Sequence, residues 1–139
     1  MTTGVAGLLD AVRYHWSSMP FVFVYLDAIL FTLAMVLIAW EMVVNPFAET
    51  SVRIQTDRGH TVITSGPYRM VRHPMYLGAI LMYTAASLVW GSIWALALAA
   101  MITGLRIWRT SREDQTLRQE LAGYEEYSAR TRDRLLPGL

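Results

Sequence analysis

Cysteine and lysine are both absent from this chain of 139 residues. Without cysteine the chain can form no disulfide framework, no thiolate nucleophile and no cysteine-bound metal site. The histidines His15, His60 and His73 are far apart in the sequence, so we expect no metal site. The formal net charge is only +1, and it creates no strong attraction to nucleic acid, so no nucleic-acid partner is expected.

Several common catalytic and cofactor motifs are missing as well. The sequence contains no Gly-x-Gly-x-x-Gly dinucleotide fingerprint, no phosphate-binding loop, no Gly-x-Ser-x-Gly and no His-Glu-x-x-His. Charged residues are scarce, at 17%, whereas soluble domains have about 25%. Apolar residues make up 54%, which is above the usual range of about 45–50%. This composition indicates a membrane protein, and the length suits one domain.

The first long apolar segment is residues 21–44, "FVFVYLDAILFTLAMVLIAWEMVV". It is long enough to cross a hydrocarbon core of roughly 30 Å. Asn45 and Pro46 supply a helix stop at its end. We therefore predict a first membrane helix at 21–44, preceded by an interfacial segment at 1–20 with a short helix from Val5 to Trp16.

Two acids interrupt this predicted helix. Glu41 is near its end, and we expect its side chain to reach the interface. Asp27 lies about two turns in, where a charge is costly unless it is paired or protonated. One interpretation is that Asp27 lines a polar cavity. The interpretation that we favour is that Asp27 lies near the headgroups, or that it is neutral and hydrogen-bonded to a neighbouring helix.

A second apolar region runs from Met75 to Trp108 and is too long for one crossing. The break at Gly91 predicts a helical hairpin with arms Met75–Val89 and Ile93–Trp108. The polar loop 45–74 contains "SVRIQ" and "HTVITSG", whose alternation is typical of short strands or extended segments. The tail 109–139 has high helix propensity as far as Leu121, and a second short helix is expected from Tyr124 to about Arg132.

The distribution of arginine predicts the orientation. The loop 45–74 has four arginines, the turn at Gly91 has none, and the tail is rich in arginine. By the positive-inside rule, the loop and the tail share the cytoplasmic side. We therefore expect residues 1–139 to form one all-α integral membrane domain with about three transmembrane helices, the last two forming the hairpin 75–108. The tail then folds over the membrane face that carries the loop.

A dense polar motif, "SGPYRMVRHPMYLG" at 65–78, comes directly before the hairpin. Pro74 suits the first position of a helix, and the free N–H groups of such a helix start favour an anion. Arg72 and His73 can add donors, so we interpret the turn as a binding site. The alternative is that Arg72 contacts lipid headgroups and that His73 only caps the helix.

Two further groups of residues lie in the tail. Arg109 and Glu113 are four apart on one helical face at the membrane boundary, with Asp114 following. They are either an ordinary surface ion pair or, as we favour at this boundary of low dielectric constant, part of a ligand site. Tyr124, Tyr127 and Arg130 share a face of the second tail helix, and they either cover an aromatic ligand or pack the tail against the loop.

These motifs resemble the integral-membrane methyltransferases typified by isoprenylcysteine carboxyl methyltransferase and by the phosphatidylethanolamine N-methyltransferases. The resemblance covers about Arg58 to Leu139. It implies S-adenosylmethionine as the cofactor and methyl transfer to a lipid-borne or hydrophobic acceptor. Asp114 is a departure, because the family often has a second glutamate there. In this interpretation Arg109 and Glu113 are catalytic, and the cofactor is bound by Tyr68, Arg72, His73, Pro74, Tyr76, Leu77, Gly78, Glu113, Asp114, Tyr127 and Arg130.

Other functions stay open on the sequence alone. Arg109 suits an anionic acceptor, whereas Glu113 suits an amine from which it can take a proton. A non-catalytic membrane protein that binds a nucleotide-like ligand or serves in assembly is one alternative. An oxidoreductase that resembles the membrane sterol reductases is another. A homo-oligomer is compatible with the sequence.

Overall fold

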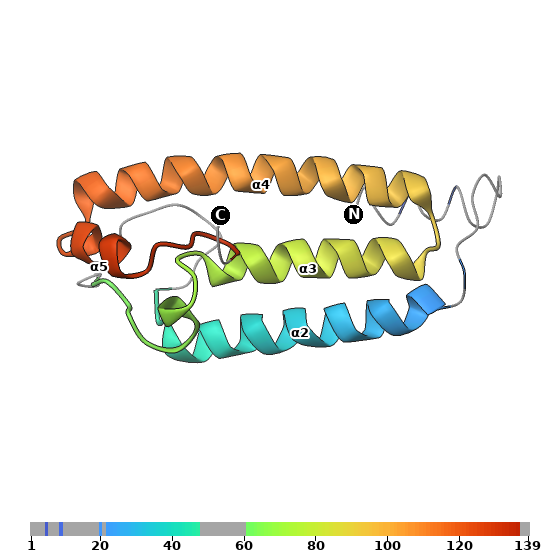
Figure 1. Cartoon of the computed structure of the whole chain (residues 1–139), viewed down its shortest axis with the longest axis horizontal. Coiled ribbons are helices and arrows are strands. Elements are labelled where there is room, and N and C mark those ends of the chain that lie inside the picture. Colours follow the sequence, from blue (N-terminus) through green and yellow to red (C-terminus); the bar gives the residue numbers. More distant parts are fainter. Residues whose placement is uncertain (1–4, 6–8, 10–19, 21, 48–60, 137–139) are drawn as a thin grey trace. The chain divides into compact units, whose positions relative to one another are not determined.

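The computed structural model describes residues 5, 9, 20, 22–47 and 61–136. Its regular elements in these ranges are, in chain order (Figure 1), α2 (Val22–Val44), the short 3-10 helix η3 (Gly66–Arg69), α3 (Pro74–Val89), α4 (Ile93–Glu120) and α5 (Tyr124–Arg130). The described residues form no strand, so the predicted all-α class is confirmed for them. The "SVRIQ" segment and almost all of the predicted N-terminal helix lie outside the described residues.

The chain divides into two compact units. The first comprises Met1–Val36 and Gly78–Arg106, and the second comprises Leu37–Leu77 and Ile107–Leu139. Of the residues that the sequence assigns to a site, Gly78 belongs to the first unit and all the others belong to the second. The second unit is therefore the part of the protein in which a site can be sought.

The helix α2 is the one described helix that is both long and apolar enough to cross a membrane. It has 23 residues and a mean hydropathy of 2.5. Large apolar side chains such as Tyr25 and Ile29 are exposed in the first unit, whereas Ala34 is fully buried. Such a dense band of exposed apolar surface is stable in lipid rather than in water. The predicted first membrane helix at 21–44 therefore agrees with α2 within one residue.

The helix α3 begins and ends close to where the sequence places it, and α4 begins where predicted. Gly91 lies between them with a φ of 60°, a conformation that favours glycine. The Ser92 hydroxyl accepts the backbone N–H of Ala95 at 3.2 Å, which caps the start of α4. The Ser87 hydroxyl bonds the Ala95 carbonyl at 3.1 Å and joins α3 to α4. With 16 residues, α3 is shorter than the roughly 20 needed for a crossing, so the membrane hairpin and the total of three crossings stay predictions.

The helix α4 continues without a break past Trp108, the residue where the predicted hairpin ends. It runs to Glu120, because the polar segment that follows Trp108 has high helix propensity of its own. Gly123, with a φ of 81°, separates it from α5. The second tail helix is thus present as predicted, although it ends at Arg130 instead of Arg132.

A small apolar core holds the second unit together. It consists of Leu121, Tyr124 and Tyr127, and the partly buried Val62, Tyr68 and Leu117 pack against it. Val62, which precedes η3, and Tyr68, which lies within η3, thereby pack against Leu121 and α5. Residues 61–64, which the sequence predicts to be extended or strand-like, have no regular secondary structure.

Glycine at position 66 allows η3 to lie against the end of α2. Gly66 has a φ of 58°, and a Cβ atom on it would lie 2.8 Å from Val44 Cγ2 and 3.2 Å from Trp40 Nε1. Beside this contact Glu41 is only 3% exposed, and it accepts the Tyr68 hydroxyl at 2.6 Å. The expectation that Glu41 reaches the interface is therefore wrong, because its carboxylate is enclosed by the loop that follows the helix.

We expect Gly66→Ala to destabilise the second unit more than Gly123→Ala does. Both substitutions place alanine at a positive φ, which costs roughly 1–2 kcal/mol. Only Gly66 adds a steric overlap, because no atom lies within 4 Å of a Cβ on Gly123. Thermal unfolding of the two variants in detergent micelles measures the difference. Equal losses of stability would show that η3 does not pack tightly against α2.

Candidate functional site

The residues Arg72, His73 and Pro74 form the entrance to α3. Pro74 is the first residue of the helix, as predicted, where its missing N–H group costs no hydrogen bond. The His73 carbonyl accepts the N–H of Leu77 at 3.2 Å and closes the first turn. All three entrance residues are buried. Their side chains are therefore held in a fixed position at the start of the helix.

The C-terminal tail covers this entrance through its backbone. The N–H groups of Arg72 and His73 donate to the carbonyls of Asp133 and Arg134, both at 3.0 Å. The Arg72 guanidinium also donates through Nη2 to the Arg132 carbonyl at 2.9 Å. The motif and the tail are therefore joined by hydrogen bonds in the second unit.

Asp114 of α4 is the centre of a buried polar cluster. Its Oδ2 forms an ion pair with Arg72 Nη1 and lies 3.4 Å from Nε of Arg118. Its Oδ1 accepts the Tyr124 hydroxyl at 2.7 Å and lies 3.4 Å from His73 Nε2. The carboxylate thus connects α4, the motif and α5. Both of its oxygens are engaged by protein groups and are not open to a ligand.

The surroundings of Asp114 keep it ionised. Burial alone raises the pKa of a carboxyl group, but His73, Tyr124 and the positive charge of Arg72 outweigh burial and hold the pKa of Asp114 well below its usual range. Burial, followed by the bond to Asp114, raises the pKa of Tyr124 far above its usual value. At neutral pH the cluster therefore pairs a carboxylate with a phenol that keeps its proton.

Two polar atoms at the entrance have no hydrogen-bond partner among the described residues. They are Nε of Arg72 and Nε2 of His73, in side chains that are 6% and 4% exposed. Buried polar atoms without a partner are uncommon in native proteins and require an explanation. A bound ligand with acceptor atoms is one such explanation, since both atoms can be donors.

Glu113 is next to Asp114 on α4 and has a different environment. Its Oε2 accepts the hydroxyl of Tyr76 at 2.7 Å, and this hydroxyl also interacts with Arg109. Glu113 and Arg109 are both half-buried. The structure thus brings Arg109 and Glu113 together with Tyr76 of the motif, and the three form a polar group that includes both charges.

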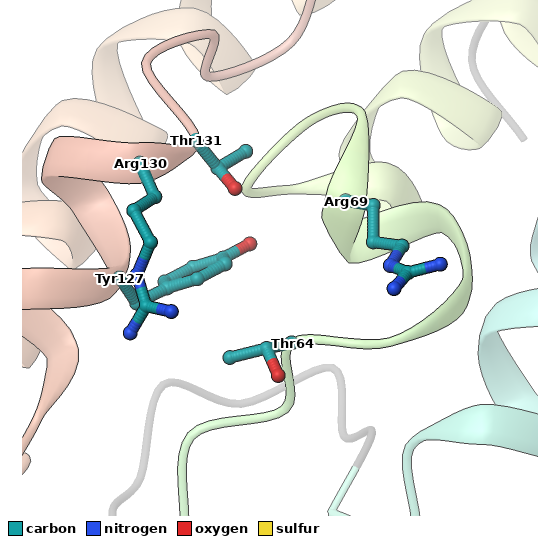
Figure 2. Close-up of a pocket in the computed structure, with 5 residues that line it drawn as sticks. All are labelled: Thr64, Arg69, Tyr127, Arg130 and Thr131. Carbon is teal, nitrogen blue, oxygen red and sulfur yellow. The ribbon is translucent and has the colours of Figure 1, made fainter.

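A cavity of about 310 Å³ lies between η3 and the residues around α5. Figure 2 shows Arg69 on one side and Arg130 with Tyr127 on the other. Thr64 and Thr131 complete the lining. Burial raises the pKa of Tyr127 to about 12, so its hydroxyl stays protonated at neutral pH and donates to the Tyr68 carbonyl at 2.8 Å. Among the described residues, the cavity lining therefore contains two guanidinium groups and no acidic side chain.

Tyr68 connects the motif to α2 in a way that the sequence analysis did not predict. Its hydroxyl donates to Glu41 and accepts a bond from Asn45 Nδ2 at 2.5 Å. Burial, followed by Glu41, raises the pKa of Tyr68 far above its usual value, so the phenol keeps its proton. The presence of an acid near the end of an apolar helix was the signal in the sequence for this contact, but we interpreted Asn45 only as a helix stop.

The structure therefore divides the predicted site residues of the second unit into two sets. The first set lies where the start of α3 contacts α4. It consists of Arg72, His73, Pro74, Tyr76, Leu77, Arg109, Glu113 and Asp114. The second set comprises Tyr127 and Arg130 at the cavity, with Tyr68 beside them. Sequence reasoning missed Glu41, Asn45, Thr64, Arg69 and Thr131 as neighbours of these sets.

We expect Asp114→Asn to destabilise the protein by about 3–5 kcal/mol at neutral pH, because it leaves the buried Arg72 charge without its partner. Since the pKa of Asp114 is lowered on folding, its contribution is complete above the unfolded value of about 3.9 and is lost as the pH falls further. The difference in melting temperature between wild type and variant should shrink in acid. Glu120→Gln, at an exposed position of α4, is the control. A difference that is the same at pH 7 and pH 3 would contradict the ionised cluster.

Comparison with known proteins places these features in a family. The sequence model of the phospholipid methyltransferase family matches residues 22–122. The match begins before Arg58, so it includes α2, and it ends before α5. A Delta(14)-sterol reductase of Mus musculus, TM7SF2, is 34% identical over 87 residues, which are 60% of this chain. The chain spans only 21% of the length of that reductase. No solved structure matches the chain.

The family match covers most of the chain and includes the motif, Glu113 and Asp114 with its partner Arg72, whereas Tyr124 lies beyond it. The chain belongs to the phospholipid methyltransferase family.

Proposed function

We propose that this protein is a membrane methyltransferase that moves a methyl group from S-adenosylmethionine to a lipid-borne or hydrophobic small acceptor. Family membership supports methyl transfer as the reaction. The observation that carries the proposal is the Glu113 carboxylate, which is half-buried, accepts the Tyr76 hydroxyl and lies one helical turn beyond Arg109. A carboxylate and a guanidinium held together in this way can bind oppositely charged groups of a ligand.

The residues around the entrance to α3 fit the charges of this cofactor. S-adenosylmethionine has a carboxylate, an amine, ribose hydroxyls and a cationic sulfonium. Arg72 Nε, which has no hydrogen-bond partner among the described residues, and His73 Nε2, which lies 3.4 Å from Asp114, can donate to its acceptor atoms, and Glu113 can accept from the amine or the ribose. When bound, the cofactor supplies a methyl group that is already activated, so the protein must mainly align the reactants and exclude water.

We keep the sequence-based cofactor site as part of the proposal. Its members in the second unit are Tyr68, Arg72, His73, Pro74, Tyr76, Leu77, Glu113, Asp114, Tyr127 and Arg130. Within this set Asp114 acts indirectly. Because its oxygens are engaged by Arg72 and Tyr124, its role is to hold Arg72 and His73 in place.

Arg109 and Glu113 would bind or deprotonate the acceptor. Glu113 can take the proton that an amine acceptor loses, and the bond from Tyr76 keeps the carboxylate oriented. Arg109 can instead hold an acceptor that carries a carboxylate or phosphate. The acceptor would arrive from the bilayer, and the cofactor would arrive from the cytosol. This requires the proposed orientation, with the loop 45–74 and the tail on the cytoplasmic side.

A second candidate function is a reductase-like oxidoreductase. The similarity to the mouse Delta(14)-sterol reductase favours it. Such a protein would bind a nicotinamide cofactor, which nicotinamide fluorescence detects. A non-catalytic binding protein would instead bind S-adenosylhomocysteine and transfer no methyl group to total membrane lipid.

We expect Glu113→Gln to reduce methyl transfer by about a hundredfold or more, roughly 2.7 kcal/mol of transition-state stabilisation. Glutamine keeps the shape and can still accept the Tyr76 hydroxyl, so the melting temperature without ligand should barely change. The assay is transfer of a labelled methyl group to extracted lipids. An ordinary surface ion pair would cost at most about 0.5 kcal/mol of stability and leave turnover near normal. That outcome would remove Glu113 from the chemistry.

We expect His73→Ala to weaken the binding of S-adenosylhomocysteine at least tenfold, about 1.4 kcal/mol, measured by calorimetry. The physical reason is the loss of Nε2, a buried potential donor whose nearest charged neighbour is Asp114 Oδ1 at 3.4 Å and which forms no hydrogen bond within the described residues. The backbone bond from residue 73 to the tail is kept in the variant. Gln119→Ala, at an exposed position on α4, is the control. Unchanged affinity in a folded His73→Ala variant argues against this pocket.

A further inference from the structure

The cavity between η3 and α5 has the chemistry of an anion site. Arg69 and Arg130 lie on opposite sides of it, and the hydroxyl groups of Thr64 and Thr131 are on its lining (Figure 2). Arginine forms forked hydrogen bonds that match the oxygens of phosphate. The Thr64 hydroxyl can add a further donor, whereas the Thr131 hydroxyl already donates to the Tyr68 carbonyl at 3.3 Å. Its volume of about 310 Å³ is at the lower end of ligand sites, which usually span about 300–1,000 Å³.

Few negative charges compete for these arginines. Arg130 pairs with Glu126 at 3.1 Å, but both side chains are largely exposed, at 70% and 78%, so this bond is weak and easily exchanged. Tyr127 is neutral at physiological pH, because its pKa is raised to about 12 by burial. Among the described residues, an anion in the cavity would therefore contact the positive charges of Arg69 and Arg130 and the neutral ring of Tyr127.

The cavity wall formed by η3 lies beside the end of the candidate membrane span. Gly66 of η3 lies against Val44, the last residue of α2, and Tyr68 is bonded to Glu41. Next to Arg69, the apolar side chain of Met70 is 64% exposed. An exposed apolar residue beside an exposed arginine, at the end of a membrane helix, is typical of the headgroup region, where lipid phosphates are concentrated.

We propose that this cavity binds the phosphate of a membrane lipid headgroup, through Arg69 and Arg130 with the hydroxyl of Thr64. This site goes beyond the proposed methyl transfer and does not require it. It competes with the proposed assignment of Tyr127 and Arg130 to the cofactor. A lipid held there would fix η3, and with it the motif, at the membrane surface.

The test uses the full chain in a neutral detergent, with thermal unfolding followed during titration with phosphatidylglycerol. We expect the phospholipid to raise the melting temperature and diacylglycerol with the same acyl chains to have no comparable effect. Arg69→Gln should weaken the apparent lipid affinity about fivefold, the effect of one interfacial arginine. Thr64→Val should weaken it less. Arg112→Gln removes an exposed arginine that stacks on Trp108 outside the cavity, so it should leave the affinity unchanged.

Three results would overturn the proposal. The first is a stabilisation by phosphatidylglycerol that Arg69→Gln does not reduce. The second is an equal shift with inorganic phosphate alone, which would assign the cavity to a free anion instead of a lipid. The third is a loss of S-adenosylhomocysteine affinity of tenfold or more in Arg69→Gln, which would assign the cavity to the cofactor. Absence of methyl transfer to every acceptor would refute the proposed function, but it would leave the lipid result intact.

Discussion

The carboxylate of Asp114 is the interaction on which the second unit depends. It connects α4 to the guanidinium of Arg72 at the start of α3 and to the hydroxyl of Tyr124 on α5. Arg72 in turn binds the tail through the Arg132 carbonyl. A buried ion pair of this kind adds little net stability compared with apolar packing, but the loss of one partner is costly. The cluster therefore brings distant segments together, and the loss of either charge leaves the other buried and unpaired.

Asp114 and the adjacent Glu113 on α4 have different partners. Successive residues of an α-helix point about 100° apart, so Glu113 and Asp114 cannot face the same neighbours. Asp114 is directed to Arg72 and Tyr124, whereas Glu113 meets Tyr76. Adjacent acids can thereby serve two purposes: one holds the motif in place while the other stays available to a ligand. The aspartate that departs from the resembled pattern is the one with the structural role.

The membrane helix α2 is connected to the same unit at its end. Gly66 permits η3 to approach Val44, and Tyr68 binds Glu41 by its hydroxyl. The carbonyl of Tyr68 accepts the Tyr127 hydroxyl from α5. One tyrosine of the motif therefore joins the membrane helix to the tail.

The sequence by itself determined the features that depend on neighbouring residues. The apolar run predicted α2, Gly91 predicted the break before α4, and Pro74 predicted the start of α3, because hydropathy, backbone freedom and the missing N–H act locally. The motifs also indicated the family. Only the tertiary structure decided the partners of Asp114 and Glu41, since Arg72 is 42 residues from the first and Tyr68 is 27 from the second. Such pairs depend on how distant segments approach one another, and no local pattern contains this information.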